Sequence, residues 1–117
     1  MKKIYRLRKS QDFDEIIKSK KQISNNFLVL YYARADNFKL GITIPKKFCN
    51  AVLRNYYKRQ VKAIVHSLNI YDLNFHCVLI LRKSFLKNNF ETKQESVNKI
   101  FKKLVNTINK EVKDDRI

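Results

Sequence analysis

The residues with the most evident chemistry lie between positions 46 and 66, where six Lys and Arg side chains and His66 are concentrated. At about 100° per residue, as in an α-helix, most of the polar ones share one side. That side comprises Asn55, Lys58, Arg59, Lys62 and His66, with Arg54 on its flank. No acidic residue occurs from Lys39 to Tyr71, whereas solvated helix faces usually mix charges, because opposite charges one turn apart stabilise an exposed helix. The pattern therefore favours contact with a polyanion over a merely solvated face.

The other side of this stretch is apolar, which predicts a helix packed on a core. It comprises Leu53, Tyr57, Val61, Ile64 and Leu68. In chain order, the elements that must position this helix are expected to be a basic arm (1–9), a helix (10–20), a short strand (22–24), strands at 27–35 and 38–44, the basic helix (50–68), a strand (75–82), a loop with one helical turn (84–90) and a last helix from about residue 92, with residues 114–117 frayed. The arm is either a frayed terminus or a tail that contacts RNA.

Local signals suggest how these elements begin, end and pair. Ser10 is expected to cap the first helix. Asp36 and Asn37 form a turn signal, so the strands on either side are predicted to pair as a hairpin. Pro45 ends the second of these strands, because proline cannot donate to a strand ladder. The continuous apolar run at 78–81 predicts a strand in the middle of the sheet, and the last helix has the amphipathic pattern of a packing helix.

Part of the basic stretch resembles the RNR signature of the protein subunit of bacterial ribonuclease P. The matching residues, in this spacing, are Lys46, Lys47, Asn50, Ala51, Val52, Arg54, Asn55, Lys58 and Arg59. The resemblance implies a protein that assists a catalytic RNA in removing the 5′ leader from precursor tRNA. The residues that it implies for binding the RNA subunit are Lys46, Lys47, Asn50, Arg54, Asn55, Lys58 and Arg59, and the clustering of cations on this helix adds Lys62.

The chain departs from the family pattern at three places. Family members usually carry Gly at the position of Cys49, a second Arg at that of Tyr56, and Arg-Glu near Lys62 and Ala63. The change at Tyr56 removes one expected RNA contact and leaves Arg54 and the cations that follow in register.

A second candidate surface is aromatic and has single-stranded RNA as its expected ligand. Its residues come from the first helix, the first long strand and the end of the later strand: Phe13, Ile17, Tyr31, Tyr32, Arg82 and Lys83. Aromatic faces stack on bases of any sequence, at roughly 1–3 kcal/mol per base. The resemblance implies that this cleft between helix and sheet holds the leader, with Ile17 where another aromatic is common. The sequence leaves open which of Tyr31 and Tyr32 faces the cleft, and whether Phe13 and Ile17 are simply core residues.

No pattern in the chain is typical of catalysis or metal binding. Of the ten Asp and Glu residues, half lie on or beside the last helix, three lie on the first helix, where they suit its dipole, and two lie in expected turns. Two Cys and two His residues have no ligand spacing. We therefore expect no catalytic residue, metal ligand or bound cofactor in the protein itself. The resemblance implies an active site in the RNA subunit, with magnesium needed for the RNA-catalysed reaction.

The composition of the chain limits the number of domains, the kind of ligand and the expected location. The 117 residues, 44% of them hydrophobic, suit one folded domain, and a formal charge of +16 with a pI near 10.0 points to nucleic acid or an anionic membrane surface. No apolar run suits a membrane span or a secretory signal, so a cytoplasmic location is expected. The expected partners are the catalytic RNA subunit and precursor tRNA, with no membrane and no further protein.

The expected fold is a single α+β domain over residues 1–117, with a helix, a central and mainly antiparallel sheet of about four strands, and a C-terminal packing helix. The resemblance implies the fold known as ribosomal protein S-five domain-two-like, whose βαβ crossover is left-handed although such crossovers are normally right-handed. Three other functions are compatible with parts of this pattern. A structural or ribosomal RNA-binding protein is the main alternative. A helix-turn-helix DNA binder needs two short adjacent helices, and a membrane-surface helix would need the apolar face that the sheet requires.

Overall fold

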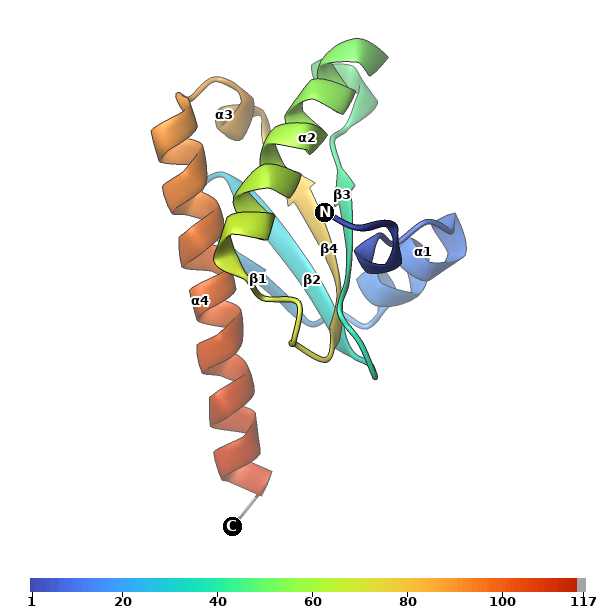
Figure 1. The fold of residues 1–117 in the computed structure, drawn as a ribbon, viewed down its shortest axis with the longest axis vertical. Helices are drawn as coiled ribbons and strands as arrows, with labels where there is room; N and C mark the ends of the chain where they lie inside the picture. The colour runs from blue at the N-terminus through green and yellow to red at the C-terminus, as the bar shows by residue number, and fades with distance from the viewer. Residues whose placement is uncertain (116–117) are drawn as a thin grey trace.

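The computed structural model describes residues 1–115, with side chains through Lys110 (Figure 1). Its elements are η1 (Lys3–Tyr5), α1 (Ser10–Lys18), β1 (Gln22–Ser24), β2 (Leu28–Arg34), β3 (Lys39–Thr43), η2 (Lys46–Phe48), α2 (Ala51–Leu68), β4 (Phe75–Leu81), α3 (Lys83–Leu86) and α4 (Phe90–Asp115). Each predicted helix and strand is thus present, within a few residues of its expected bounds. The backbone of α4 is helical through Asp115, and the rest of the segment expected to fray lies outside the described residues.

The four strands form one sheet in the order β1-β2-β4-β3. β1 pairs antiparallel with β2, β2 pairs antiparallel with β4, and β3 pairs parallel with β4. The mainly antiparallel sheet and its central β4 are therefore confirmed, but the predicted hairpin of β2 with β3 is wrong. Since Ala33 and Lys39 both pair with His76, the short segment between β2 and β3 crosses the end of β4. β4 takes the inner position because it buries Val78 on one face and Cys77 and Leu79 on the other.

The unit formed by β3, α2 and β4 has the left-handed crossover that the resemblance implied. In Figure 1, β3 and β4 both point upward, α2 lies in front of them, and the chain moves from β3 leftward to β4. A right-handed crossover with the helix in front would move to the right.

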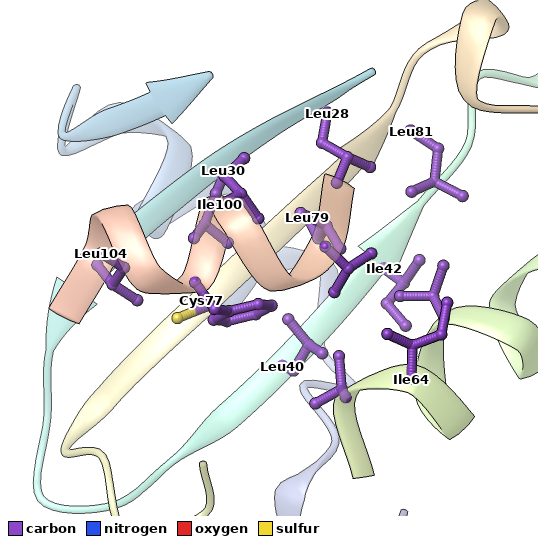
Figure 2. Packing of buried hydrophobic residues seen from close by; sticks show 14 of the residues in the cluster. Leu28, Leu30, Leu40, Ile42, Ile64, Cys77, Leu79, Leu81, Ile100 and Leu104 are labelled. Atoms are coloured by element: carbon purple, nitrogen blue, oxygen red, sulfur yellow. The ribbon is translucent and has the colours of Figure 1, made fainter. Parts of the chain in front are cut away.

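The main core lies between the sheet and the two long helices, α2 and α4. Figure 2 shows Leu28, Leu30, Leu40, Ile42, Cys77, Leu79 and Leu81 of the strands together with Ile64 of α2 and with Ile100 and Leu104 of α4. Ile64, Ile100 and Leu104 are almost completely buried, as the apolar stripes of their helices predicted. A smaller cluster of Leu7, Ile16 and Val78 lies on the opposite face, beneath α1. One face of the sheet is thus covered by α2 and α4 and the other by α1, and each face has a separate cluster of buried side chains.

The N-terminal arm packs on the domain. The Leu7 amide donates to the Leu40 carbonyl over 3.1 Å, at the outer edge of β3. The Tyr5 ring stacks on Tyr71, with 4.2 Å between centroids, and Leu7 is buried. The expected cap of α1 is wrong, because Ser10 is already inside the helix and Lys9, at the capping position, makes no side-chain cap. Packing of the arm, and not a local cap, therefore positions the start of α1.

Candidate nucleic-acid interface

Helix α2, which carries most of the predicted cations, is bounded by residues that suit its ends. Asn50 precedes it in extended conformation, and its Oδ1 accepts a hydrogen bond from the Leu53 amide over 3.0 Å. Asn69 ends it in the left-handed conformation, with φ of 51°. The first turns of α2 reach beyond the ends of the strands in Figure 1. Leu53 is 42% exposed as a result, so its predicted place in the buried stripe is wrong, while Val61 and Ile64 are buried as predicted.

The eight residues expected to bind the RNA subunit lie on η2, at the N-cap of α2 and on α2 itself, and they differ in burial. Lys46, Lys47, Asn50, Asn55 and Arg59 are exposed, whereas Arg54, Lys58 and Lys62 are half-buried. The Arg54 guanidinium donates from Nη1 to the Cys49 carbonyl over 2.8 Å. Arg54 therefore holds the turn before α2 in place with one of its five N–H donors and keeps the others for a ligand.

A basic groove joins α2 to the N-terminal arm and the sheet. It encloses about 250 Å³ and is lined by Arg6, Leu7, Arg8, Phe13, Leu40, Gly41, Ile42, Lys58 and Lys62. Burial, followed by the neighbouring charges of Arg6, Lys58 and Arg59, lowers the pKa of Lys62. Each of those charges repels a proton on Lys62, so an anion bound in the groove would stabilise the charged forms of Arg6, Lys58 and Lys62, which line it together.

Arg6 and Arg8 of this groove were not among the predicted site residues. The sequence offered one signal for them, the density of cations in residues 1–9, but it did not show where the arm lies. The structure supplies that place, since the contact of Leu7 with Leu40 sets the arm beside β3 and turns Arg6 toward Lys62.

The aromatic surface lies on the face of the sheet that α1 covers. Phe13, Ile17 and Tyr31 all pack on the cluster of Leu7, Ile16 and Val78. The Phe13 ring sits directly on Gly41, so closely that a Cβ added to Gly41 would overlap it. Gly41 and Tyr31 both pair with Val78, and the three residues therefore form a row across β3, β4 and β2. Phe13 is consequently both a packing residue and one wall of the groove.

Tyr32 does not share this surface. Successive side chains of a strand point to opposite faces, and Tyr32 is buried in the main core, where its ring meets Phe75 edge-on at 6.0 Å. Tyr31 is thus the tyrosine that faces α1, and the inclusion of Tyr32 among leader-binding residues is corrected. Arg82 and Lys83 are exposed where β4 ends and α3 begins. Arg82 is four residues beyond Val78, about 13 Å along an extended strand, so Phe13 and Arg82 are suited to different nucleotides of a bound strand.

The remaining ionisable groups suggest structural roles. Among residues 1–110, whose side chains the structure describes, no three His, Cys, Asp or Glu side chains come together as metal ligands would. Burial raises the pKa of the Cys77 thiol to about 12. His66 lies at the exposed end of α2 and shares a 2.8 Å hydrogen bond with the Tyr71 hydroxyl.

None of the helices in the described part of the chain has both the length and the apolar character needed to cross a membrane.

The fold and this surface define a class, that of an α+β domain whose basic helix and neighbouring sheet face suit RNA. Comparison with known proteins makes the class specific. The family model described as ribonuclease P matches residues 1–105, and the chain belongs to this family. The ribonuclease P protein component of Mycoplasmopsis synoviae (strain 53) is 54% identical over 101 residues, which cover 86% of this chain and 90% of that relative.

Solved structures agree with this assignment. The Staphylococcus aureus RNase P protein superposes with a TM-score of 0.76 at 31% identity, over 84% of this chain and 93% of that one. The RNase P protein from Thermotoga maritima gives a TM-score of 0.72 at 31% identity, over 81% and 94% of the two chains. The resemblance and the fold class drawn from the sequence are thereby confirmed.

Proposed function

We propose that this chain is the protein subunit of a ribonuclease P ribonucleoprotein and binds its catalytic RNA through η2 and α2. The observation that carries the proposal is the cation cluster at the groove, where Lys58 and Lys62 of α2 lie beside Arg6 and Arg8 of the N-terminal arm. Such a cluster is costly in the free protein and becomes favourable when RNA phosphates neutralise it. The contacts are proposed for Lys46, Lys47, Asn50, Arg54, Asn55, Lys58, Arg59 and Lys62, with Arg6 and Arg8 added from the groove.

The 5′ leader of precursor tRNA is proposed to lie along the face of the sheet beside α1, which adjoins the groove at Phe13. Phe13 and Tyr31 offer ring surface there, and Ile17 packs beside them. The exposed Arg82 and Lys83 are suited to phosphates farther along the leader. Ring stacking and phosphate contacts do not read base edges, which suits leaders of variable sequence.

The chemistry of cleavage is proposed to take place in the RNA. Hydrolysis of a phosphodiester by a protein needs an acid–base pair or a metal site, and the carboxylates of the described residues are not grouped with His or Cys in threes. Magnesium is therefore proposed to be held by the RNA, with no cofactor on the protein. We also propose a cytoplasmic location, where precursor tRNA is processed.

The test is precursor tRNA cleavage by a bacterial ribonuclease P RNA at low magnesium, with and without this protein. The protein should accelerate cleavage at the leader junction, because its cations replace part of the magnesium that the RNA and substrate otherwise need. The protein alone should leave the substrate intact. An unchanged rate with the protein would overturn the subunit role, and site-specific cleavage by RNA-free protein, surviving controls for contaminating nuclease, would overturn the assignment of catalysis to RNA.

A further inference from the structure

The outer surface of α2 has an uncharged strip beside its cations. Val52 is 76% exposed, Leu53 42% and Tyr56 52%. At about 100° per residue, Val52 and Tyr56 lie within about 40° of each other, and Arg59 lies about 20° to the other side of Val52. Apolar side chains this exposed, side by side on one helix end, are typical of a binding surface when their rim is polar.

Neighbouring side chains hold the Tyr56 ring in place. The Tyr56 hydroxyl accepts a hydrogen bond from Nε2 of Gln60 over 3.1 Å. The Tyr57 ring meets it edge-on, with 5.4 Å between centroids and 66° between planes. Gln60 is in turn fixed from α4, because the buried Lys93 donates from Nζ to its Oε1 over 3.1 Å. A ring held at its hydroxyl and at one edge loses little conformational entropy when a second planar group stacks on its free face.

The charge around the strip selects the occupant. Lys46 and Lys47 belong to η2, Arg54 and Arg59 belong to the first half of α2, and no acidic residue occurs from Lys39 to Tyr71. An occupant must therefore offer an apolar planar face and negative charge together, a combination that an unpaired nucleotide of RNA has.

We propose that Tyr56 is a base-stacking residue, with one unpaired nucleobase of the bound RNA resting on its ring and Val52 and Leu53 lining the edge of that contact. The proposal rests on the proposed function, because it assumes that α2 binds RNA. The proposal also explains why this chain differs from the family pattern at Tyr56. Where the signature has a second Arg, this chain exchanges a charge contact for a stacking contact and keeps the neighbouring phosphate contact at Arg59.

A single tryptophan tests the proposal directly, because the chain contains none. Tyr56→Trp places an indole in the strip, and its emission should be quenched when a transcribed bacterial ribonuclease P RNA is added, as stacking on a base requires. Phe90→Trp is the matched control, since Phe90 is also an exposed ring, 49% accessible, at the start of α4 and outside the cation cluster. Its emission should change little in the same titration.

Affinity gives the second readout. Tyr56→Ala should weaken binding of that RNA roughly 5- to 150-fold, the range that corresponds to ~1–3 kcal/mol of stacking at 1.4 kcal/mol per tenfold. Tyr56→Phe should retain most of the affinity, because it keeps the ring. The slope of log Kd against log salt should stay that of the unmodified protein for both variants, since neither removes a charge. Circular dichroism of each variant checks that the domain remains folded.

The outcomes separate this proposal from the proposed function. If the unmodified protein binds the RNA but Tyr56→Ala binds equally well, or the Tyr56→Trp emission does not respond, the stacking role is overturned and the RNA-binding role stands. If the unmodified protein does not bind the RNA, both fall. A response of Tyr56→Trp to anionic lipid vesicles or to rising protein concentration, with none to RNA, would assign the strip to a membrane surface or a second copy and overturn the proposal.

Discussion

Replacement of Gly41 by alanine should destabilise the domain through one contact, that with the Phe13 ring. A Cβ at this position would overlap the ring carbons Cζ and Cε1 of Phe13. The ring cannot move toward the sheet, so it must tilt outward and lose contact with the cluster that contains Val78. Overpacking of this kind costs about 1–3 kcal/mol. The same change in the absence of the ring should be favourable by about 0.5–1 kcal/mol, because alanine in a strand is better than glycine.

A double-mutant cycle measures this difference. Urea unfolding, followed by circular dichroism, gives the free energy of unfolding of the unmodified protein, Gly41→Ala, Phe13→Ala and the double variant. Phe13→Ala alone should cost less than the ~3–5 kcal/mol of a fully buried ring, because Phe13 is half-buried. The coupling energy between the two changes should be at least about 1.5 kcal/mol, with the double variant more stable than Phe13→Ala alone.

Additive effects, agreeing within about 0.5 kcal/mol, would refute the contact. They would mean that the Phe13 ring spends its time away from Gly41 in solution. The Phe13 ring would then not form a wall of the groove beside β3.

Three other predictions concern charge and acidity. Arg59→Ala and Lys58→Ala should each lower the slope of log Kd against log salt for ribonuclease P RNA by up to about one, measured by filter binding; an unchanged slope in the double variant would exclude this face. The thiol of Cys77 has its pKa raised from 9.0 to about 12 by burial, so the unfolded state releases the proton first and the free energy of unfolding should fall above pH 9, by up to ~1.4 kcal/mol per pH unit. Cys77→Ala should show a shallower loss between pH 8 and 10 in urea titrations, and parallel curves would contradict the burial effect. The exposed pair Arg82→Ala/Lys83→Ala should weaken holoenzyme affinity for precursor tRNA but not for mature tRNA, and equal losses would place the leader elsewhere.

Local patterns in the sequence were sufficient to predict the elements. The apolar stripe of Val61 and Ile64 placed α2 against the core, and the uninterrupted run after Cys77 placed β4 inside the sheet. The helical stripe and the apolar run are each visible within one segment of the sequence, so they can be recognised without knowing which other elements pack against that segment. The RNR resemblance supplied the crossover hand, for which periodicity carries no information.

The errors arose where a distant segment decides the outcome. The chain does bend at Asp36 and Asn37, as the turn signal predicted. A hairpin also requires β2 and β3 to be neighbours in the sheet, and β4 lies between them. Tyr31 and Tyr32 could not be told apart, because both faces of β2 are covered, one by α1 and the other by the long helices. Arg6 was missed because its role depends on where Leu7 docks.

The strand order also sets a lower limit on when the domain can form during synthesis. β4 is the last strand to be made, yet it is the only one that joins β3 to the rest of the four-stranded sheet. Until residues 75–81 have left the ribosome, β3 has no strand to pair with. The apolar side chains of β2 and α2 also lack the core residues that β4 supplies. A nascent chain that stops before residue 75 should therefore remain open to proteases and chaperones. The ordered domain should form once β4 has been inserted and α4, which supplies Ile100 and Leu104 to the same core, has been made, at the entropic cost of closing long loops.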